Sequence, residues 1–273
     1  MKLLVVFLCI LAAGNIVDKE ISYTASTPAG RTVRDFLGIN QADSIDFIRW
    51  QLKIVDGKEF ALSCSYGISK PNTNGFIDEK KLVLKGNANS KDGTLTLNKA
   101  GKLLSMQVLN DNIMHLLNQD GSLMIGNGGW SYTLNNFTPA TDAAINFKSP
   151  RSTFKDSMAL EGRSPCGVPG IIPEGVQCYK LKWYVVLYTG DANNKSGMYK
   201  ILGTPWRKQG GKTGKWTVIT AKDGHIIFRL DKDDGSALLN LLQLDNNIFV
   251  FTDASDKLLV GNEDFSYTLN RFF

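Results

Sequence analysis

The sequence predicts an all-β protein made of two tandem antiparallel up-and-down β-barrels. Three observations carry this prediction: two segments of the chain repeat each other, apolar and polar residues alternate along most of it, and turn residues recur at roughly every eight to twelve positions. No long segment has apolar residues at the spacing of a helix. Eight antiparallel strands commonly close into a barrel, which removes exposed strand edges.

The repeat is clearest near the end of each half. Leu123–Phe137 (LMIGNGGWSYTLNNF) and Leu258–Phe272 (LLVGNEDFSYTLNRF) share nine of fifteen residues at an offset of 135. Upstream at the same offset, Asn110–Ile113 faces Asp245–Ile248. Such internal similarity indicates that one structural unit occurs twice, so each copy is expected to bury its own ring of alternating side chains.

Two further matches extend the repeat towards the start of each copy. Ile45–Trp50 matches Cys178–Trp183 at an offset of 133, and Phe36–Gly38 matches Leu160–Gly162 at an offset of 124. The difference, 133 − 124, predicts about nine extra residues in the second copy, as a loop insertion at Cys166–Cys178. The duplicated tryptophans Trp50 and Trp183 are interpreted as core residues, because a repeated aromatic side chain favours packing.

The repeat sets the predicted boundaries. We expect a signal peptide at 1–14, barrel repeat 1 at 18–137, a linker at 138–142 and barrel repeat 2 at 142–273. Turn signals divide each repeat into strands. The clearest of these turns are Asp56-Gly57, Asp92-Gly93, Asn110-Asp111, Asp120-Gly121, Gly210-Gly211, Asp223-Gly224, Asp234-Gly235 and Asp245-Asn246.

The first residues predict export. Lys2 precedes the apolar run Leu3–Leu11, and Ala12, Ala13 and Gly14 follow it, as in a signal peptide cleaved near Gly14. Small residues are absent before Cys9, so that cysteine is interpreted as part of the signal rather than as a lipid-attachment site. The mature chain is therefore expected to be exported, without a lipid anchor.

Composition limits the other possibilities. The 273 residues are 43% hydrophobic and 21% charged, which describes a globular chain. The net charge of +5 is spread along the sequence, so nucleic acid is not an expected partner. Beyond the first residues no apolar run reaches the length of a transmembrane helix, and none is predicted.

The three cysteines outside the signal have different expected fates. In an oxidising compartment Cys166 and Cys178 are expected to form a disulfide that closes a short loop, worth about 3 kcal/mol. Cys64 lies in an alternating apolar run, Phe60–Tyr66, and is interpreted as a buried free thiol.

The second copy resembles a known family. Glu161–Cys166, Gly214–Thr217, Asp256–Leu259 and Ser266–Arg271 are similar to the NlpE-like copper-resistance and envelope-stress lipoprotein domain family. The first copy resembles it more faintly. The resemblance implies a lipocalin-like barrel, here in two tandem copies, located in the periplasm or cell envelope of a Gram-negative bacterium. It also implies a role in copper tolerance, surface adhesion or envelope-stress signalling.

A copper site would need soft ligands close together. If Asn110-Asp111 is a two-residue hairpin turn, Met106 lies opposite His115 on one face and could begin a Cu(I) site. The second copy has Leu241 and Val250 at those positions, so ordinary core packing is the favoured interpretation, and no cofactor is expected.

A second candidate contact is a basic segment flanked by tryptophans, which could meet acidic lipid head groups, polysaccharide or another ligand. A solvated hairpin loop is the favoured alternative. The residues of this segment are Trp206, Arg207, Lys208, Lys212 and Lys215.

Catalysis is not expected. The two histidines lie in different copies, and His225 follows a turn, where a solvent-exposed strand end is predicted. Ser164 lacks the surroundings of an activated nucleophile. We therefore predict a non-enzymatic, exported envelope binding or stress-sensing module whose partner is an envelope protein or a small ligand. The alternative is a lipocalin-style carrier of a small apolar ligand, which would require an open barrel interior.

Overall fold

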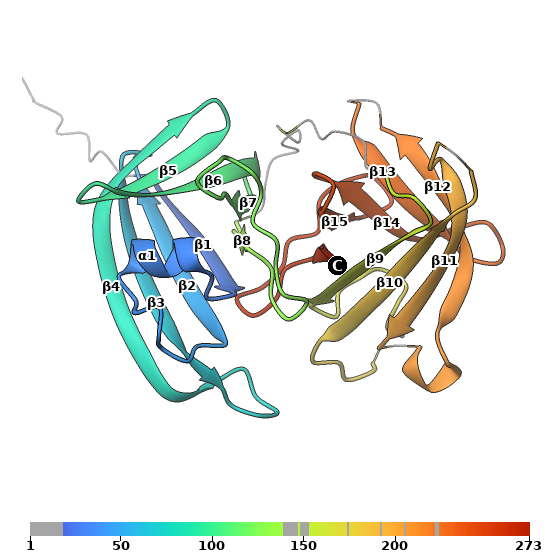
Figure 1. The fold of residues 1–273 in the computed structure, drawn as a ribbon, viewed down its shortest axis with the longest axis horizontal. Coiled ribbons are helices and arrows are strands. Elements are labelled where there is room, and N and C mark those ends of the chain that lie inside the picture. Colours follow the sequence, from blue (N-terminus) through green and yellow to red (C-terminus); the bar gives the residue numbers. More distant parts are fainter. Residues whose placement is uncertain are drawn as a thin grey trace, which may run out of the picture.

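The computed structural model describes residues 19–138, 147, 153–173, 175–191, 193–204, 206–221 and 224–273. Two closed barrels of eight antiparallel strands lie side by side, barrel 1 from β1–β8 and barrel 2 from β9–β16 (Figure 1). The predicted fold class is therefore confirmed. The predicted signal peptide at 1–14 lies outside the described residues, and so does the predicted linker at 138–142 apart from Thr138.

In each barrel, consecutive strands pair in chain order, and the first strand pairs with the last to close the ring. Barrel 1 consists of β1 (Glu20–Thr27), β2 (Phe47–Val55), β3 (Glu59–Ser69), β4 (Phe76–Lys91), β5 (Thr94–Lys99), β6 (Lys102–Asn110), β7 (Ile113–Leu116) and β8 (Thr133–Asn135), with the helix α1 (Arg31–Leu37) after β1. Barrel 2 consists of β9 (Ser157–Ser164), β10 (Leu181–Thr189), β11 (Ser196–Gly203), β12 (Lys212–Thr220), β13 (Ile226–Asp231), β14 (Ala237–Gln243), β15 (Ile248–Thr252) and β16 (Thr268–Phe272), with a short 3-10 helix, η1 (Arg207–Gln209), before β12.

Two of the predicted turns have the backbone that a two-residue hairpin needs. Asp92 and Gly93 are the two residues between β4 and β5, with φ of 49° and 76°. Asp56 and Gly57 have φ of 50° and 67°, and with Lys58 they connect β2 to β3. Positive φ at both central positions matches the right-handed twist of the strands, and Asp-Gly tolerates it.

The two barrels correspond strand for strand, but at a different offset from the predicted one near their starts. Ala25 pairs with Trp50 in barrel 1, and Gly162 pairs with Trp183 in barrel 2. β1 therefore corresponds to β9 at an offset of 137 (162 − 25), and the alignment of Phe36–Gly38 with Leu160–Gly162 is wrong. Between the entry strand and the tryptophan, copy one is longer by four residues (50 − 25 against 183 − 162), so the prediction of about nine extra residues in copy two is also wrong.

The tryptophans are buried core residues in both barrels, as predicted. Trp50 Nε1 donates to Thr27 Oγ1 at 2.8 Å, and Trp183 Nε1 donates to Ser164 Oγ at 2.9 Å. Each indole therefore has its single donor satisfied by a hydroxyl at the end of the entry strand, which allows a buried tryptophan to stay in an apolar core.

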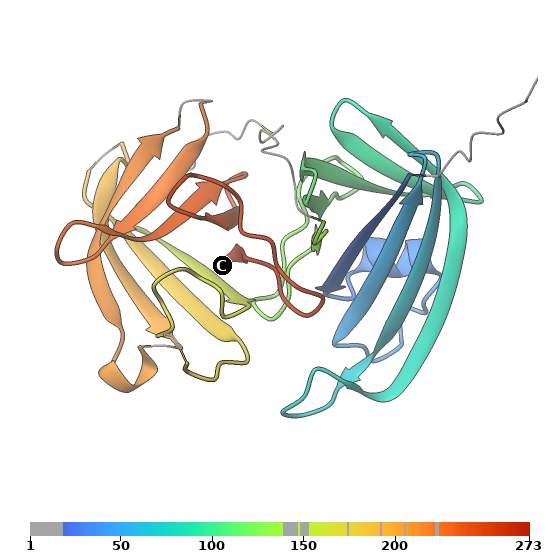
Figure 2. The same ribbon diagram turned by 180° about the vertical axis from the view of Figure 1, so that it is seen from behind.

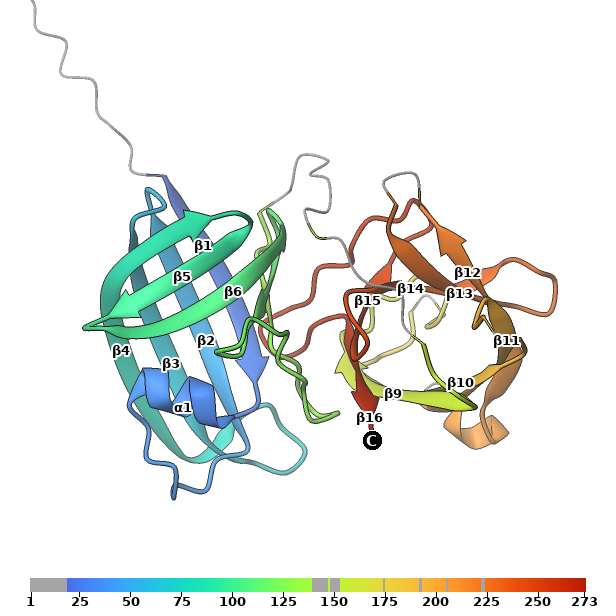
Figure 3. The same ribbon diagram turned by 45° about the horizontal axis from the view of Figure 1, so that its top comes forward.

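After the entry strand, the two copies diverge. In barrel 1 the chain forms α1, which crosses the direction of the strands (Figures 1 and 3) and buries Val33, Phe36 and Leu37 in the barrel core. Gly38 ends the helix in the left-handed conformation, with φ of 75°. In barrel 2 the counterpart of α1 is the loop closed by the Cys166–Cys178 disulfide, with Cα atoms 5.9 Å apart.

A third apolar cluster joins the barrels, in addition to the core of each barrel. We call it the seam; its buried members are Leu109, Ile113, Leu117, Leu123, Ile227, Leu242, Leu244, Ile248, Val250 and Leu258. Leu109, Ile113 and Leu123 have counterparts 135 residues later, at Leu244, Ile248 and Leu258. The same patch of each copy is thus buried against the other, which is the pattern of an isologous interface.

Hydrogen bonds across the seam repeat this symmetry. Ser131 Oγ and Ser266 Oγ lie 2.6 Å apart, and Thr133 Oγ1 and Thr268 Oγ1 lie 2.9 Å apart, so equivalent hydroxyls meet each other. Two reciprocal bonds flank them: Gly126 N donates to Asn270 Oδ1 at 2.7 Å, and Gly261 N donates to Asn135 Oδ1 at 2.9 Å. The barrels are related by a pseudo-two-fold axis through these hydroxyl pairs. Figure 2 shows the β7–β8 and β15–β16 loops between the barrels.

Candidate functional site

The predicted pairing of Met106 with His115 is wrong. Met106 lies opposite Leu116 and His115 opposite Gln107, so Met106 and His115 are on opposite faces of the sheet. The register shifts between Val108 and Asn110 because the Asn110 side chain accepts hydrogen bonds from the backbone N–H groups of Asn112 and Ile113. One extra residue at such a bulge moves every later side chain to the other face.

His115 is a buried part of the junction between the barrels. Its Nδ1 lies 3.0 Å from Thr133 Oγ1 and its Nε2 lies 2.8 Å from the Met124 carbonyl oxygen. Burial lowers the pKa of His115 to about 4. Met106 belongs to the core of barrel 1. Across the part of the chain that the structure describes, no group of three or more His, Cys, Asp or Glu side chains is arranged to hold a metal ion.

The basic segment forms the connection between β11 and β12. Arg207 and Lys208 are exposed on η1, Lys215 is exposed on β12, and Lys212 Nζ lies 2.8 Å from Asp233 Oδ2. Trp206 packs against the core of barrel 2, with its ring 6.4 Å from that of Trp183. The structure therefore separates the tryptophan, which is part of the core, from cations that face away from it.

Two other residues can now be placed. His225 is buried and its Nε2 contacts the Phe147 carbonyl oxygen, so the prediction of an exposed strand end is wrong. Cys64 is a free, buried thiol, as predicted, and burial raises its pKa. A thiol held in this way stays protonated and unreactive at neutral pH.

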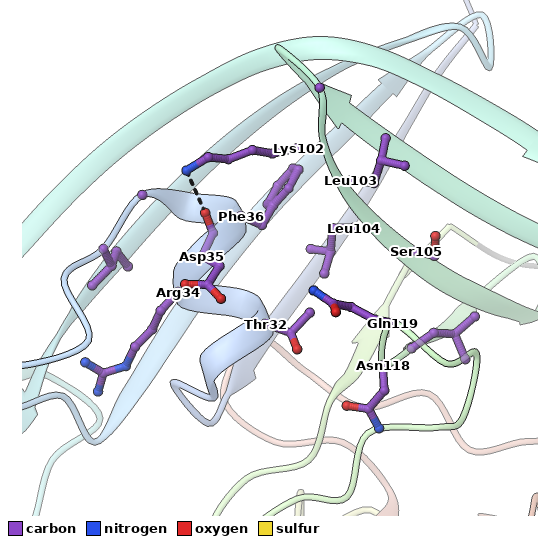
Figure 4. Close-up of a pocket in the computed structure, with 14 residues that line it drawn as sticks. Thr32, Arg34, Asp35, Phe36, Lys102, Leu103, Leu104, Ser105, Asn118 and Gln119 are labelled. Atoms are coloured by element: carbon purple, nitrogen blue, oxygen red, sulfur yellow. Dashed lines mark hydrogen bonds between the residues drawn. The ribbon is translucent and has the colours of Figure 1, made fainter.

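A further functional candidate is a groove that the sequence did not reveal. We call it the α1 groove: a cavity of 740 Å³ between α1, the start of β6 and the segment after β7 (Figure 4). Phe36, Leu104 and Leu117 supply buried apolar surface. Ile39 and Leu103 are further apolar residues of the lining, and its polar residues are Thr32, Arg34, Asp35, Lys102, Ser105, Asn118 and Gln119.

Several of these polar groups have fixed positions. Lys102 Nζ donates to the Asp35 carbonyl oxygen at 3.0 Å (Figure 4), which ties β6 to α1 across the groove. Arg34 is buried, and its guanidinium donates to the carbonyl oxygens of Ala29, Asn40 and Asp43 at 2.7 to 3.0 Å. Arg34 therefore anchors the ends of α1 to the chain that follows it, and so fixes one wall of the groove.

The pseudo-two-fold axis gives this groove a counterpart in barrel 2. All seven lining positions in Lys102–Ser105 and Leu117–Gln119 recur, 135 residues later, in the lining of a second cavity. That second cavity measures only 80 Å³, because Val168 and Pro169 of the disulfide loop lie against it where α1 stands in barrel 1. One of two duplicated sites is thus open, and the other is nearly filled.

The interior of barrel 2 is filled by aromatic side chains in contact with one another. Ring centroids lie 5.4 Å apart for Trp216 and Phe228, and again 5.4 Å apart for Phe228 and Phe249. Trp183 and Phe251 are 5.1 Å apart. In barrel 1 Trp50, Leu62 and Leu97 are fully buried in one cluster. Bulky side chains that meet inside a barrel leave the surface grooves as the better binding sites.

Comparison with known proteins identifies no relative. No protein-family model, no curated protein and no solved structure matches this chain. No helix within the described residues is long and apolar enough to cross a membrane.

Proposed function

We propose that this chain is an exported, non-enzymatic binding module of the NlpE-like type, and that the α1 groove is its ligand site. The observation that carries the proposal is the contrast between 740 Å³ in barrel 1 and 80 Å³ at the equivalent place in barrel 2. Packing alone would be served by filling both places. An open cavity with an apolar floor and a polar rim is the usual form of a small-molecule site.

The lining indicates the class of ligand. The buried faces of Phe36, Leu104 and Leu117 favour an apolar body, while the Lys102 ammonium and the amides of Asn118 and Gln119 favour an anionic or hydrogen-bonding head. Lys102 is the one cation among the seven duplicated positions, and its counterpart is Ala237. A small amphipathic molecule with an acidic head fits this pattern best.

Two features support the proposal of an exported protein that binds its ligand in a surface groove. The Cys166–Cys178 disulfide is typical of proteins in an oxidising compartment, in agreement with the predicted leader at 1–14. The filled interior of barrel 2 favours a surface groove over a carrier that encloses its ligand. The proposed binding role needs no cofactor, and the separation of Met106 from His115 gives copper no shared ligand pair.

The groove is tested with the dye 1-anilinonaphthalene-8-sulfonate, which has an apolar body and an acidic head. We expect the purified chain to bind it at one site. Thr32→Trp would place a large ring in the groove and weaken binding at least tenfold, and Lys102→Ala would weaken binding severalfold. Arg31→Trp is the matched control, because Arg31 is on the same helix, does not line the groove and has an 88% exposed side chain.

Dye titration followed by fluorescence gives the affinities, and circular dichroism checks that each variant is folded. Equal affinity for the wild type and Thr32→Trp would contradict the proposal, as would an equal loss in Arg31→Trp. Export is tested separately by the N-terminal sequence of the secreted protein, which should begin near residue 15.

A further inference from the structure

Two equivalent loops lie beside the seam, and each of them docks onto the opposite barrel. Asn127 and Asn262 begin these loops, and each side chain accepts hydrogen bonds from the backbone N–H groups two and three residues later. The two loops have the same backbone hydrogen bonds, so residues at an offset of 135 occupy equivalent places. Gly129 thus corresponds to Asp264, and Trp130 corresponds to Phe265.

At the first of these places, which we call the Asp264 contact, the charges are balanced. Asp264 Oδ1 lies 2.6 Å from Arg49 Nη2, and its Oδ2 accepts from Asn74. Ser26 Oγ donates to the Glu263 carbonyl oxygen at 2.8 Å. The carboxylate of one copy therefore neutralises an arginine of the other copy.

At the second place, which we call the Gly129 contact, the carboxylate is missing and the cations are more numerous. Lys182 stands where barrel 1 has Arg49, at the offset of 133, and Arg163 stands where it has Ser26, at the offset of 137. A Cβ atom added to Gly129 would lie 3.6 Å from Arg163 Cζ and 3.7 Å from its Nη1. The direction of the absent side chain is therefore towards the guanidinium.

The cations of the Gly129 contact lie close together. Arg163 and Lys182 are direct cross-strand partners on β9 and β10, an arrangement that is unfavourable for like charges. Lys180 is near both of them. Burial is the main cause that lowers the pKa of Lys180, and the positive charges of Arg163 and Lys182 lower it further. In the described part of the chain none of these three side chains forms an ion pair.

Two acids face this cluster, and neither replaces the missing group. Asp264 raises the pKa of Lys180 and lines the same crevice, but its own oxygens are held by Arg49 and Asn74. Glu161 lies near Arg163 on the same strand, and burial raises its pKa. The four cations Arg49, Arg163, Lys180 and Lys182 thus outnumber the two carboxylates.

Aromatic rings frame the cations. The Arg163 guanidinium lies 5.1 Å from the centre of the Trp130 ring, and Lys180 Nζ lies 5.3 Å from the centre of the Phe265 ring. These four side chains line a crevice of 20 Å³, about the space of one small polar group, together with Asp264 and the barrel 1 residues Phe47, Ser69, Thr73 and Asn74. Only the head of a ligand can enter it, and the rest must lie outside.

We propose that the Gly129 contact is a second binding site, distinct from the α1 groove, which receives a carboxylate from outside the chain in the role that Asp264 has at its counterpart. The carboxylate binds beside the Arg163 guanidinium, with Lys180 and Lys182 contributing charge. Its source is a free small carboxylate or an acidic side chain of a peptide.

The test uses the full mature chain and measures thermal unfolding in sodium acetate against sodium chloride at equal ionic strength. The wild type should unfold at a higher temperature in acetate, by an amount that saturates with concentration. Gly129→Asp supplies the carboxylate from within the chain, as copy two does. It should unfold at a higher temperature in chloride and lose the acetate response.

Gly129→Asn is the matched control, since it has the same shape without the charge, and it should keep the acetate response. Arg163→Ser introduces the residue of copy one and should raise the acetate concentration needed for half of the response at least tenfold. This variant tests the proposal even if Gly129→Asp does not fold. An equal wild-type response in acetate and chloride would refute the proposal, as would a full response in Arg163→Ser. The titration is then repeated with a glutamate-rich hexapeptide to distinguish the two sources of the carboxylate. Half-saturation at a concentration ten times lower than with acetate indicates a peptide as the ligand, and any other result indicates a free small carboxylate.

Discussion

Barrel 1 and barrel 2 share strand order, the buried tryptophan with its hydroxyl partner, and one face of the seam, but the chain after their entry strands differs. Barrel 1 has α1, held by the buried Arg34, and keeps a groove of 740 Å³. Barrel 2 has a disulfide-closed loop that leaves 80 Å³. The strands and the seam constrain both copies, so the segment that is free to vary is where the two copies can acquire different functions.

The seam offers the strongest test of the symmetry between the barrels. Leu109→Ala and Leu244→Ala each remove a fully buried side chain at equivalent places, and each should lower the free energy of unfolding by about 2–5 kcal/mol. Urea denaturation measures both, with Leu103→Ala, which is 60% exposed in the wild type, as a control with little effect. A large loss in only one of the two seam variants would contradict the pseudo-two-fold interface.

The disulfide provides a test of how barrel 2 differs from barrel 1. Replacing Cys166 and Cys178 by alanine should destabilise barrel 2 by about 3 kcal/mol, because the closed loop no longer restricts the unfolded chain. Calorimetry with and without a reducing agent measures the loss. The double variant should not respond to the reducing agent, and an unchanged unfolding temperature in the reduced wild type would show that the loop is held by packing alone.

His115 makes barrel 1 more sensitive to acid than barrel 2, where Val250 occupies the place. Its pKa is about 4 in the folded chain, against an ordinary value of 6.5, so the unfolded chain takes up the proton first as the pH falls. Its contribution is complete above pH 6.5 and is lost progressively towards pH 4, by about 2 kcal/mol at pH 5. Urea denaturation at pH 7 and pH 5 should show this loss in the wild type and a smaller one in His115→Val.

The smallest expected effect concerns the shared tryptophan motif. Thr27→Val and Ser164→Ala remove the hydroxyls that accept from Trp50 and Trp183, and each should cost about 1 kcal/mol. Because the two bonds have nearly the same length and burial, the two losses should agree. Urea denaturation of both variants provides the comparison, and a clear difference would show that the two cores are not equivalent around their tryptophans.

Much of the fold was accessible from the residues. Alternation and Asp-Gly turns predicted the strands, and the repeat at an offset of 135 predicted two barrels. Ser131, Thr133 and their counterparts also lie in the most similar segment of the repeat. Similarity alone, however, could not show that these equivalent hydroxyls meet across an interface. The match of Phe36–Gly38 failed because three residues are too few to fix a register.

The candidate sites were less accessible. The predicted Met106–His115 pair failed because the Asn110 side chain inserts a bulge, which depends on local hydrogen bonds rather than on alternation. The α1 groove could not be predicted because its walls come from segments about 70 residues apart, Thr32–Phe36 and Lys102–Ser105. Gly30 and Gly38 at the two ends of Arg31–Leu37 were the available signal for the helix.

By itself, the sequence determined the period of the strands, the positions of the turns and the duplication, because these depend on neighbouring residues and on their repetition. Only the tertiary structure decided which faces of the two copies meet, which of two equivalent cavities stays open and where cations outnumber carboxylates. Those outcomes depend on contacts between residues far apart in the chain, and a shift of one residue in register reverses them.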